Sequence, residues 1–471
     1  MLSEKYDLVI VGRGAAAFSA AIRASEITSG QARIAMVGNG PLGGTCVNTG
    51  CVPSKLLISI SNSFQNSLKP RYPGLPSVER PPETEVIMDF IRESVHGERK
   101  KKYEDVVESY ENIDLYTGTA VFTGEKEILV DSSHSLFGYN VLIATGSRPY
   151  VPGIKGLNET SYITTDSVWE LKHVPASIAI LGGGAVGVEI GQALSRLGSE
   201  VHIIEVSNQI LPGIPADMAS IIERSLREDG MVINTSTSVD EVSGGEGKKY
   251  LKLNGTNIND TLEVEEILVA TGRAPNIDLA LEKTGVKYSK RGIAVDEYLR
   301  TSNRKIYAAG DVVDQKYKLE TLAAREGFIS AENMFNHAMR TIDIFNVPFA
   351  VFCSPGYASV GYTQDEATKA GIKTEARRIS TKDVASERIH ANREGIINIV
   401  AEADTKEIVG VQIVAENAPE LINEASAILS KRFKTDDLIN TVHVFPTENE
   451  GLKLATQSFS RDITMMSCCM E

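Results

Sequence analysis

The sequence predicts an α/β fold with two Rossmann-like dinucleotide-binding domains followed by a C-terminal α+β domain. Residues 6–24 and 176–196 each combine an apolar strand, a glycine-rich turn and an alanine-rich helix. Each is followed later by a strand that ends in Ala-Thr-Gly, within 141–149 and 267–276. The last third instead has strand patterns at 348–361 and 394–415, then a helical pattern at 417–432. We expect a first domain of residues 1–150 and 272–345, a second of 151–271 and a third of 346–471.

Bulk composition restricts the class of partner. The chain has 471 residues and a formal charge of −14, which argues against nucleic acid and against anionic membranes as partners. The start, MLSEKYDLVIVG, leads directly into a strand and leaves no room for a signal peptide. No apolar run reaches the ~18–20 residues of a spanning helix. We therefore expect a cytoplasmic protein.

The first glycine turn follows the buried-strand pattern YDLVIVG. Gly12 and Gly14 form the G-x-G pair, and Ala17 takes the third small position. Such a turn lets the backbone approach a pyrophosphate and directs a helix N-terminus at it. The next strand should end in an acid that holds the adenosine ribose, but Gly38 stands there. We expect a dinucleotide site without that one contact.

The second glycine turn is complete, with Gly182, Gly184 and Gly187 between a strand and a helix. Glu205 ends the following strand, where an acid hydrogen-bonds a free ribose 2′-hydroxyl and repels a 2′-phosphate. No arginine follows in Val206, Ser207 and Asn208. The sequence therefore predicts a nicotinamide site that prefers NADH, with NADPH as the weaker donor.

The cysteines are few and clustered. Cys46 and Cys51 lie in GGTCVNTGCVPSK, ahead of a helix expected to begin at Val52. A helix N-terminus lowers a thiol pKa and favours the reactive thiolate. A zinc half-site or a structural bridge is the alternative, but no second half-site with suitable spacing lies nearby. Cys353, on an apolar strand pattern, is expected to be a buried hydrophobe.

This cysteine segment resembles the active-site segment of the pyridine nucleotide–disulfide oxidoreductases, and the likeness extends over nearly the whole chain. The resemblance implies FAD at the first turn, with Asp311 of IYAAGDVV on the ribityl chain. It implies that Cys46 is the outward interchange thiol and that Cys51 lies against the flavin. It also implies that Lys55 sits near the flavin and pairs with Glu189. Further contacts to the two nucleotides are implied for Ala15, Ala16, Gly44, Thr45, Lys55, Ala120, Thr145, Gly146, Val186, Glu189, Gly272, Arg273 and Gly310.

One family residue is missing near the C-terminus. Disulfide reductases of this family carry His-x-His-Pro-Thr, whose second histidine is the acid/base and is oriented by a glutamate. Here the run is HVFPTENEG, so Phe445 replaces that histidine while Glu450 keeps the glutamate's place. Phenylalanine cannot accept a proton from a leaving thiol. His443 is about 6.5 Å away along an extended chain, so we expect it to be structural.

The C-terminus carries a second thiol pair, Cys468 and Cys469, in MMSCCME. Two adjacent thiolates suit a soft metal ion. This ending and GLKLATQSF before it are similar to those of the mercuric reductases, which lack the histidine and usually have tyrosine there. The resemblance implies a homodimer with shared active sites, in which the tail of one subunit delivers thiol-bound Hg(II) to Cys46 and Cys51 of the other. A dihydrolipoamide dehydrogenase-like disulfide reductase and a non-catalytic metal chelator are the alternatives.

Overall fold

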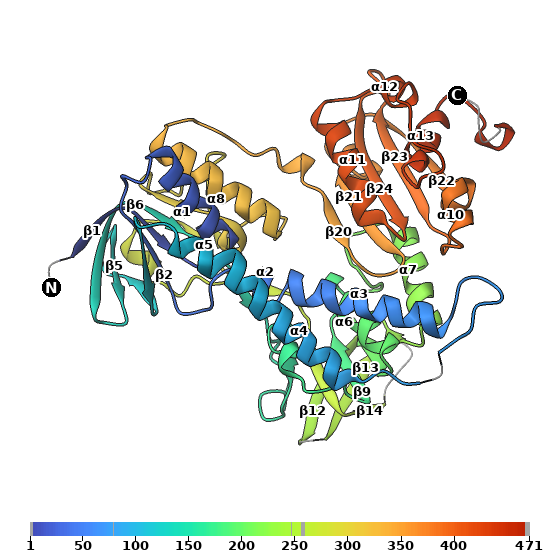
Figure 1. Ribbon diagram of the computed structural model, residues 1–471, viewed down its shortest axis with the longest axis horizontal. Coiled ribbons are helices and arrows are strands. Elements are labelled where there is room, and N and C mark those ends of the chain that lie inside the picture. Colours follow the sequence, from blue (N-terminus) through green and yellow to red (C-terminus); the bar gives the residue numbers. More distant parts are fainter. Residues whose placement is uncertain (1–2, 79, 246, 256–259, 467–471) are drawn as a thin grey trace.

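The computed structural model describes residues 3–78, 80–245, 247–255 and 260–466. The chain forms three lobes, each built around its own sheet (Figure 1). The N-terminal lobe lies at one end, while the middle segment and the C-terminal lobe lie together at the other. Helices α3 (Cys51–Leu68) and α4 (Thr84–Arg99) run side by side between the lobes.

The N-terminal lobe contains a sheet in the order β3-β2-β1-β6-β5-β4, with β19 also paired to β6. Strands β1, β2, β3, β6 and β19 are parallel, and β4 and β5 extend the sheet in the antiparallel sense. Helices α1 and α8 pack against each other, although about 300 residues separate them in the sequence. The bounds are β1 Glu4–Val11, α1 Ala15–Ile27, β2 Ile34–Gly38, β3 Ile113–Thr117, β4 Ala120–Phe122, β5 Glu127–Val130, β6 His134–Ile143, β19 Ile306–Ala308 and α8 Glu320–Phe335.

The middle lobe contains a second parallel sheet, in the order β11-β10-β9-β15-β8. Its strands are β8 Ile163–Thr164, β9 Ser177–Leu181, β10 Glu200–Ile204, β11 Val232–Asn234 and β15 Glu266–Val269, with helices α6 Ala185–Arg196 and α7 Ala216–Glu228. A small antiparallel sheet is formed by β12 Thr237–Gly245, β13 Lys248–Gly255 and β14 Thr261–Val264. The chain crosses between the first lobe and the middle lobe twice. The two crossing segments contain the short strands β7 Ser147–Pro149 and β16 Arg273–Pro275, which pair with each other.

The C-terminal lobe is an antiparallel five-stranded sheet in the order β20-β21-β24-β23-β22, with helices beside it. The expected α+β character is therefore confirmed. The strands are β20 Phe349–Val351, β21 Gly356–Gly361, β22 Thr374–Ser380, β23 Ile396–Glu402 and β24 Ile408–Ala415. The helices are α9 Gln364–Lys369, α10 Ala385–Ile389, α11 Ala418–Ser430, α12 Thr435–Ile439 and α13 Glu450–Gln457.

Short elements complete the chain. They are α2 Gly44–Asn48, a π-helical turn Lys100–Glu104, α5 Asp105–Glu108, the hairpin β17 Tyr288–Ser289 and β18 Gly292–Ile293, and 3₁₀ turns at Val168–Glu170, Leu281–Lys283, Gly310–Val312, Ile344–Asn346, Thr381–Asp383 and Ile463–Met465.

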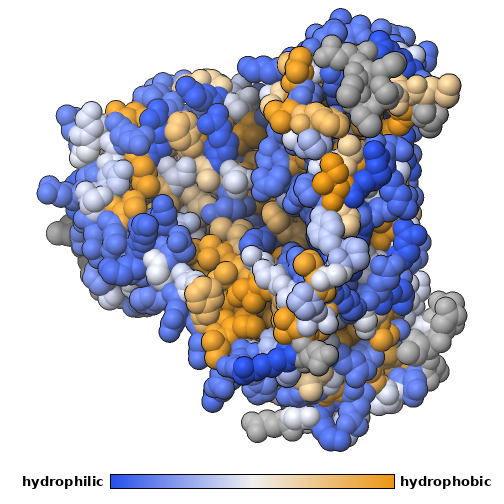
Figure 2. Space-filling model, turned by 45° about the vertical axis from the view of Figure 1, so that its right-hand side comes forward, coloured by the Kyte–Doolittle hydropathy of each residue, from blue (hydrophilic) through white to orange (hydrophobic). Residues whose placement is uncertain are grey.

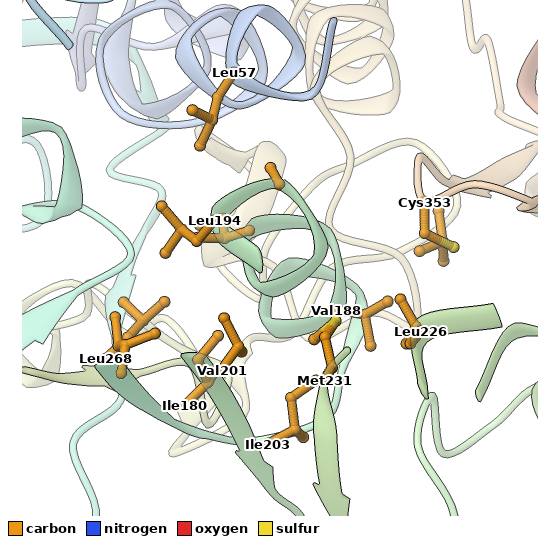
Figure 3. Close-up of a cluster of buried hydrophobic side chains, with 14 of the residues drawn as sticks. Leu57, Ile180, Val188, Leu194, Val201, Ile203, Leu226, Met231, Leu268 and Cys353 are labelled. Carbon is orange, nitrogen blue, oxygen red and sulfur yellow. The ribbon is translucent and has the colours of Figure 1, made fainter. Parts of the chain in front are cut away.

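One buried apolar cluster joins helix α3, which carries Cys51, to the middle lobe. Leu57 of α3 is 1 % exposed and points toward α6, which in turn covers the strands of the second sheet (Figure 3). Burying such aliphatic side chains stabilises by ~25 cal/mol per Å² of apolar surface. The cluster therefore fixes α3, and with it the cysteine segment, against a rigid scaffold. On the face drawn in Figure 2, hydrophobic residues gather in the hollow where the lobes meet.

Within the described part of the chain, no helix combines the length and the apolar character needed to cross a membrane.

Candidate functional site

The thiol pair lies where two helices meet. Cys46 is in α2 and Cys51 is the first residue of α3, so both cysteines are helical and α3 begins one residue before the expected Val52. Gly43 and Gly44 have φ of 85° and 62°, the left-handed region that favours glycine. A Cβ on Gly44 would come within 2.6 Å of the Gly14 Cα, so the cysteine segment packs directly on the first glycine turn.

The two sulfurs are chemically unequal. Both cysteines are free thiols, Cys46 half-buried and Cys51 exposed. A hydrogen bond from Cys46 and the nearby charge of Lys55 lower the pKa of Cys51, against the opposing effect of partial desolvation of its sulfur. The hydrogen bond with Cys51 and burial both raise the pKa of Cys46. These directions favour the thiolate on Cys51 over one on Cys46.

Lys55 and Glu189 are brought together from helices α3 and α6. The Lys55 Nζ lies 2.5 Å from Glu189 Oε2, and the Glu189 side chain is only 7 % exposed. The other carboxylate oxygen, Oε1, accepts a hydrogen bond from the backbone N–H of Phe352 at 2.9 Å. The Phe352 ring lies 4.2 Å from Lys55 Nζ in a cation–π contact. Three lobes thus fix one ammonium group one helical turn beyond Cys51.

The first glycine turn borders a cavity of about 520 Å³. Gly12 has φ of 144°, and a Cβ there would lie 2.0 Å from the Ala144 carbonyl oxygen. Helix α1 starts directly after Gly14, whose lack of a side chain leaves the helix N-terminus open to a phosphate. Predicted residues that line the cavity are Gly12, Gly14, Gly38, Gly44, Thr45, Ala120, Thr145 and Gly146. This cradle has the shape and backbone donors that the pyrophosphate of FAD requires.

Five other predicted residues lie near this cavity but do not line it. Ala15 and Ala16 open helix α1, and Gly310, with φ of 78°, lies close to Ala16. Arg273 and Asp311 line an adjoining cavity of about 610 Å³. The Ser147 hydroxyl donates to Asp311 Oδ2 at 2.7 Å and accepts from Arg273 Nε at 2.8 Å.

The structure shows which side chain covers the place of the usual acid at Gly38. A Cβ at this position would lie 3.0 Å from Cγ of Arg13, whose side chain covers it. The Arg13 guanidinium donates to the Tyr116 carbonyl and the Thr117 hydroxyl, both at 2.8 Å. Burial lowers the pKa of Arg13. Sequence reasoning passed over Arg13, because the middle residue of G-x-G carries no fixed role.

The second glycine turn borders a cavity of about 580 Å³, lined by Gly182, Gly184, Val186, Glu205 and Gly272. Gly187 faces inward, since its Cβ would meet the Gly182 carbonyl oxygen at 2.2 Å. Glu205 is buried and accepts backbone N–H bonds from Gly183 and Ser207, both at 2.7 Å. These two bonds fix its carboxylate at the rim of the cavity and leave a lone pair on each oxygen for a ribose hydroxyl.

The segment 442–450 lies in the C-terminal lobe and leads from α12 to α13. His443 has a 6 % exposed side chain, and its Nε2 lies 3.0 Å from Glu424 Oε1, an arrangement compatible with the expected structural role. Phe445 is half exposed, and Val444 is 76 % exposed. Glu450 is the first residue of α13. Sequence reasoning missed Glu424, which holds both His443 and Asn449.

A second missed residue lies beside the thiol pair itself. Glu320 is the first residue of α8, and its charge adds to the hydrogen bond with Cys51 and to burial in raising the pKa of Cys46. It follows the 306–313 motif closely in sequence, but nothing in that motif indicates an effect on Cys46. The phenol of Tyr103 is also within electrostatic range of this group, and burial raises the pKa of Tyr103 to about 12.

No group of three or more His, Cys, Asp or Glu side chains in the described ranges is arranged to hold a metal ion. Cys353 is 5 % exposed, and burial raises its pKa, which confirms the expected inert hydrophobe. Cys468 and Cys469 lie outside the described residues.

Comparisons with known proteins identify the family of this chain. Residues 6–327 match the model of the pyridine nucleotide-disulphide oxidoreductases, and residues 347–456 match the dimerisation domain of the same family. The mercuric reductase of Staphylococcus aureus is 36 % identical over an alignment that covers 98 % of this chain and 84 % of the relative. That of Streptomyces lividans is also 36 % identical, with 98 % of both chains covered. The Cu(II) complex of the HOCl-induced flavoprotein disulfide reductase RclA from Escherichia coli has the same fold, with a TM-score of 0.85 at 24 % identity over 97 % of this chain and 100 % of that one.

Proposed function

Because this chain belongs to the pyridine nucleotide-disulphide oxidoreductase family, we propose that it reduces thiol-bound Hg(II) to Hg(0) with electrons from a nicotinamide nucleotide. The similarity to mercuric reductases along almost the whole chain supports this assignment. The observation that carries it within the molecule is Phe445, which stands where disulfide reductases of the family need a proton acceptor. Reduction of a metal held between sulfurs does not need that acceptor.

The thiol pair has the chemistry for this substrate. Hg(II) is soft and prefers two thiolate ligands, which Cys46 and Cys51 can provide by displacing two external thiols. FAD, when bound in the first cavity, carries two electrons from the nicotinamide nucleotide to this centre. The two electrons convert Hg(II) to Hg(0), which leaves, and both sulfurs remain as thiolates. Lys55 compensates negative charge near Cys51, and Glu189 and Phe352 hold Lys55 in place.

We also propose that the protein works as a cytoplasmic homodimer with shared active sites. The match to a dimerisation domain supports pairing through the C-terminal lobe. Val442 and Val444 are about four-fifths exposed in the single chain, next to Phe445, and this apolar strip suits burial against a second copy. In this arrangement Phe445 and Glu450 of one subunit belong to the site of the other, and Cys468 and Cys469 deliver the metal.

NADH is the proposed electron donor. The Glu205 carboxylate at the rim of the second cavity would repel the 2′-phosphate of NADPH at close range. We expect Glu205→Gln to narrow the preference for NADH over NADPH by about tenfold, because the amide keeps one acceptor oxygen and loses the charge. Steady-state kcat/KM for both donors measures this. A parent enzyme that turns over faster with NADPH would contradict the assignment.

One assay tests the main proposal. NADH oxidation is followed with Hg(II) in excess small thiol, for the parent, for Cys51→Ser and for the double variant Cys468→Ala/Cys469→Ala. We expect turnover in the parent, none in Cys51→Ser, and a loss in the tail variant that is larger for bulky thiol carriers than for small ones. Activity with lipoamide and none with Hg(II) would assign the chain to the disulfide reductases instead. Mercury binding without NADH oxidation would indicate a chelator.

A further inference from the structure

The Arg13 side chain crosses one end of the first cavity. It starts in the turn after β1 and lies over Gly38, the last residue of β2. Its guanidinium donates to the Tyr116 carbonyl and the Thr117 hydroxyl, both at 2.8 Å and both at the end of β3. In such folds the pyrophosphate binds at the glycine turn after the first strand, and the ribose binds beside the end of the second. The guanidinium is therefore held at the ribose end of the cavity.

The charge of Arg13 is not neutralised by a neighbouring carboxylate. Four of the described residues that line the cavity are charged, and two of them are acids. Asp278 pairs with Arg148 at 3.0 Å, and Asp166 pairs with Arg273 at 2.8 Å. The printed partners of the Arg13 guanidinium in the described part of the chain are three neutral oxygens. Burial lowers the pKa of Arg13, but an arginine pKa is so high that the charge remains at neutral pH.

The guanidinium also has an unused donor. The Arg13 Nε is buried and has no hydrogen-bond partner among the described residues. It lies 3.5 Å from the point that a Cβ on Gly38 would occupy. A buried N–H without a partner is destabilising unless a ligand or a water satisfies it. A cation with a free donor thus stands where such folds usually have an acid.

The two dinucleotide cavities of this chain therefore differ in charge at equivalent places. In the second cavity the usual acid is present, because Glu205 directly follows the second strand of its sheet, β10. An acid at this place accepts a hydrogen bond from a ribose hydroxyl and repels a phosphate on the same ribose. A guanidinium has the opposite effect, because its N–H groups donate to phosphate oxygens and its charge attracts them.

We propose that Arg13 is a specificity-determining residue of the first cavity, which binds an adenine nucleotide more tightly when its ribose carries a 2′-phosphate. Uptake of FAD by the folded chain is then open to competition from 2′-phosphorylated adenine nucleotides. This inference rests on the flavin assignment of the first cavity, which belongs to the proposed function, but it does not depend on the metal substrate.

The test measures how two small nucleotides slow the uptake of FAD. Apoprotein of the full chain is mixed with FAD in the presence of 5′-AMP or of adenosine 2′,5′-bisphosphate, which differ only in the 2′-phosphate. Rapid gel filtration at successive times gives the amount of FAD bound to the protein, and the slowing gives an inhibition constant for each nucleotide. Uptake of FAD reports the first cavity, so binding of either nucleotide to the second cavity is not counted.

In the parent, we expect adenosine 2′,5′-bisphosphate to inhibit about tenfold more strongly than 5′-AMP, the effect of opposite charges about 6 Å apart at a half-exposed site. Arg13→Met should lose this preference, because it keeps an aliphatic side chain over Gly38 and removes the charge. Arg13→Lys should keep most of it. Arg33→Met is the matched control: it removes an arginine that pairs with Asp114 at the opposite end of β2, so its ratio of inhibition constants should equal that of the parent.

Equal inhibition by the two nucleotides in the parent, or none by either at millimolar concentration, would overturn the inference. A loss in Arg13→Met that is equal for both nucleotides would also overturn it, because Arg13 would then act on the 5′-phosphate. An apoprotein that takes up no FAD would refute the flavin site and the inference with it. A protein that shows the expected preference but does not reduce Hg(II) would refute the mercury proposal and leave the role of Arg13 standing.

Discussion

Asp229 connects the middle lobe to the C-terminal lobe, and its substitution should destabilise the protein strongly. Its side chain is fully buried and forms ion pairs with Arg196 at 2.8 Å and Arg393 at 2.6 Å. Gln192 donates a further hydrogen bond to it at 2.9 Å. Although burial alone would raise the pKa of Asp229, the hydrogen bond from Arg393 and the charge of Arg196 lower it. Arg196 also donates a hydrogen bond to Asn62 of α3, so this helix is held at the same junction.

The perturbation is Asp229→Asn, which keeps the shape and removes the charge. The amide has one acceptor oxygen where the carboxylate has two, so at least one arginine donor would face an NH₂ group. Arg196, whose side chain is 4 % exposed, would stay buried without its counter-ion. Leaving a buried charge unpaired costs about 3–5 kcal/mol. If a unit of about 200 residues unfolds cooperatively, this lowers the Tm by about 6–12 °C.

Differential scanning calorimetry of the FAD-loaded protein measures this shift. Glu263→Gln is the matched control, because its ion pair with Lys248 is equally short, 2.7 Å, but exposed to solvent, and its loss should leave the Tm unchanged. The double variant Asp229→Asn/Arg196→Met should lower the Tm by less than the sum of the two single variants, since it removes both buried charges together. A Tm for Asp229→Asn within about 1 °C of the parent would refute the reasoning, because the expected cost would then be absent.

Two further predictions concern the first nucleotide site and a buried carboxyl in the C-terminal lobe. Gly12→Ala should abolish FAD binding, because its Cβ would lie 2.0 Å from a carbonyl oxygen. The flavin absorbance of the purified protein measures this. The control is Gly30→Ala, where φ is also positive, at 74°, but the space around the residue is open, so this variant should keep the flavin. Burial raises the pKa of Glu387 to about 7 from its ordinary 4.5, so the folded state holds a proton that the unfolded chain has released between these values. Stability should therefore fall by about 1–3 kcal/mol as pH rises from 4.5 to 7. Glu387→Gln cannot titrate at this position, so its urea-unfolding midpoint should not show this fall. A pH profile of the midpoint identical to that of the parent would show that Glu387 does not cause the fall.

Much of the fold was predictable because its signals are local. A strand, a glycine turn and a helix are contiguous in sequence, and a residue such as Gly12 is required by backbone geometry alone. In the two nucleotide lobes strands alternate with helices, whereas in the last third they do not. This difference predicted two α/β units followed by an α+β unit, and the sheets of the structure agree with that prediction. Helix α3 begins at Cys51, one residue before the expected Val52, because the short helix α2 at Cys46 and helix α3 follow each other too closely to be separated by sequence pattern.

The sequence by itself determined the cysteine pair, the two glycine turns and the replacement of histidine by Phe445, since each depends on which residue stands at a fixed spacing. Only the tertiary structure decided which distant groups act on them. The charge of Glu320 acts on the Cys46 thiol from more than 270 positions away in the sequence, and the Arg13 side chain covers the place of the missing acid at Gly38. The junction at Asp229 likewise joins three lobes. Such interactions arise because packing brings together side chains that are distant in the sequence, and they leave no periodicity in the chain.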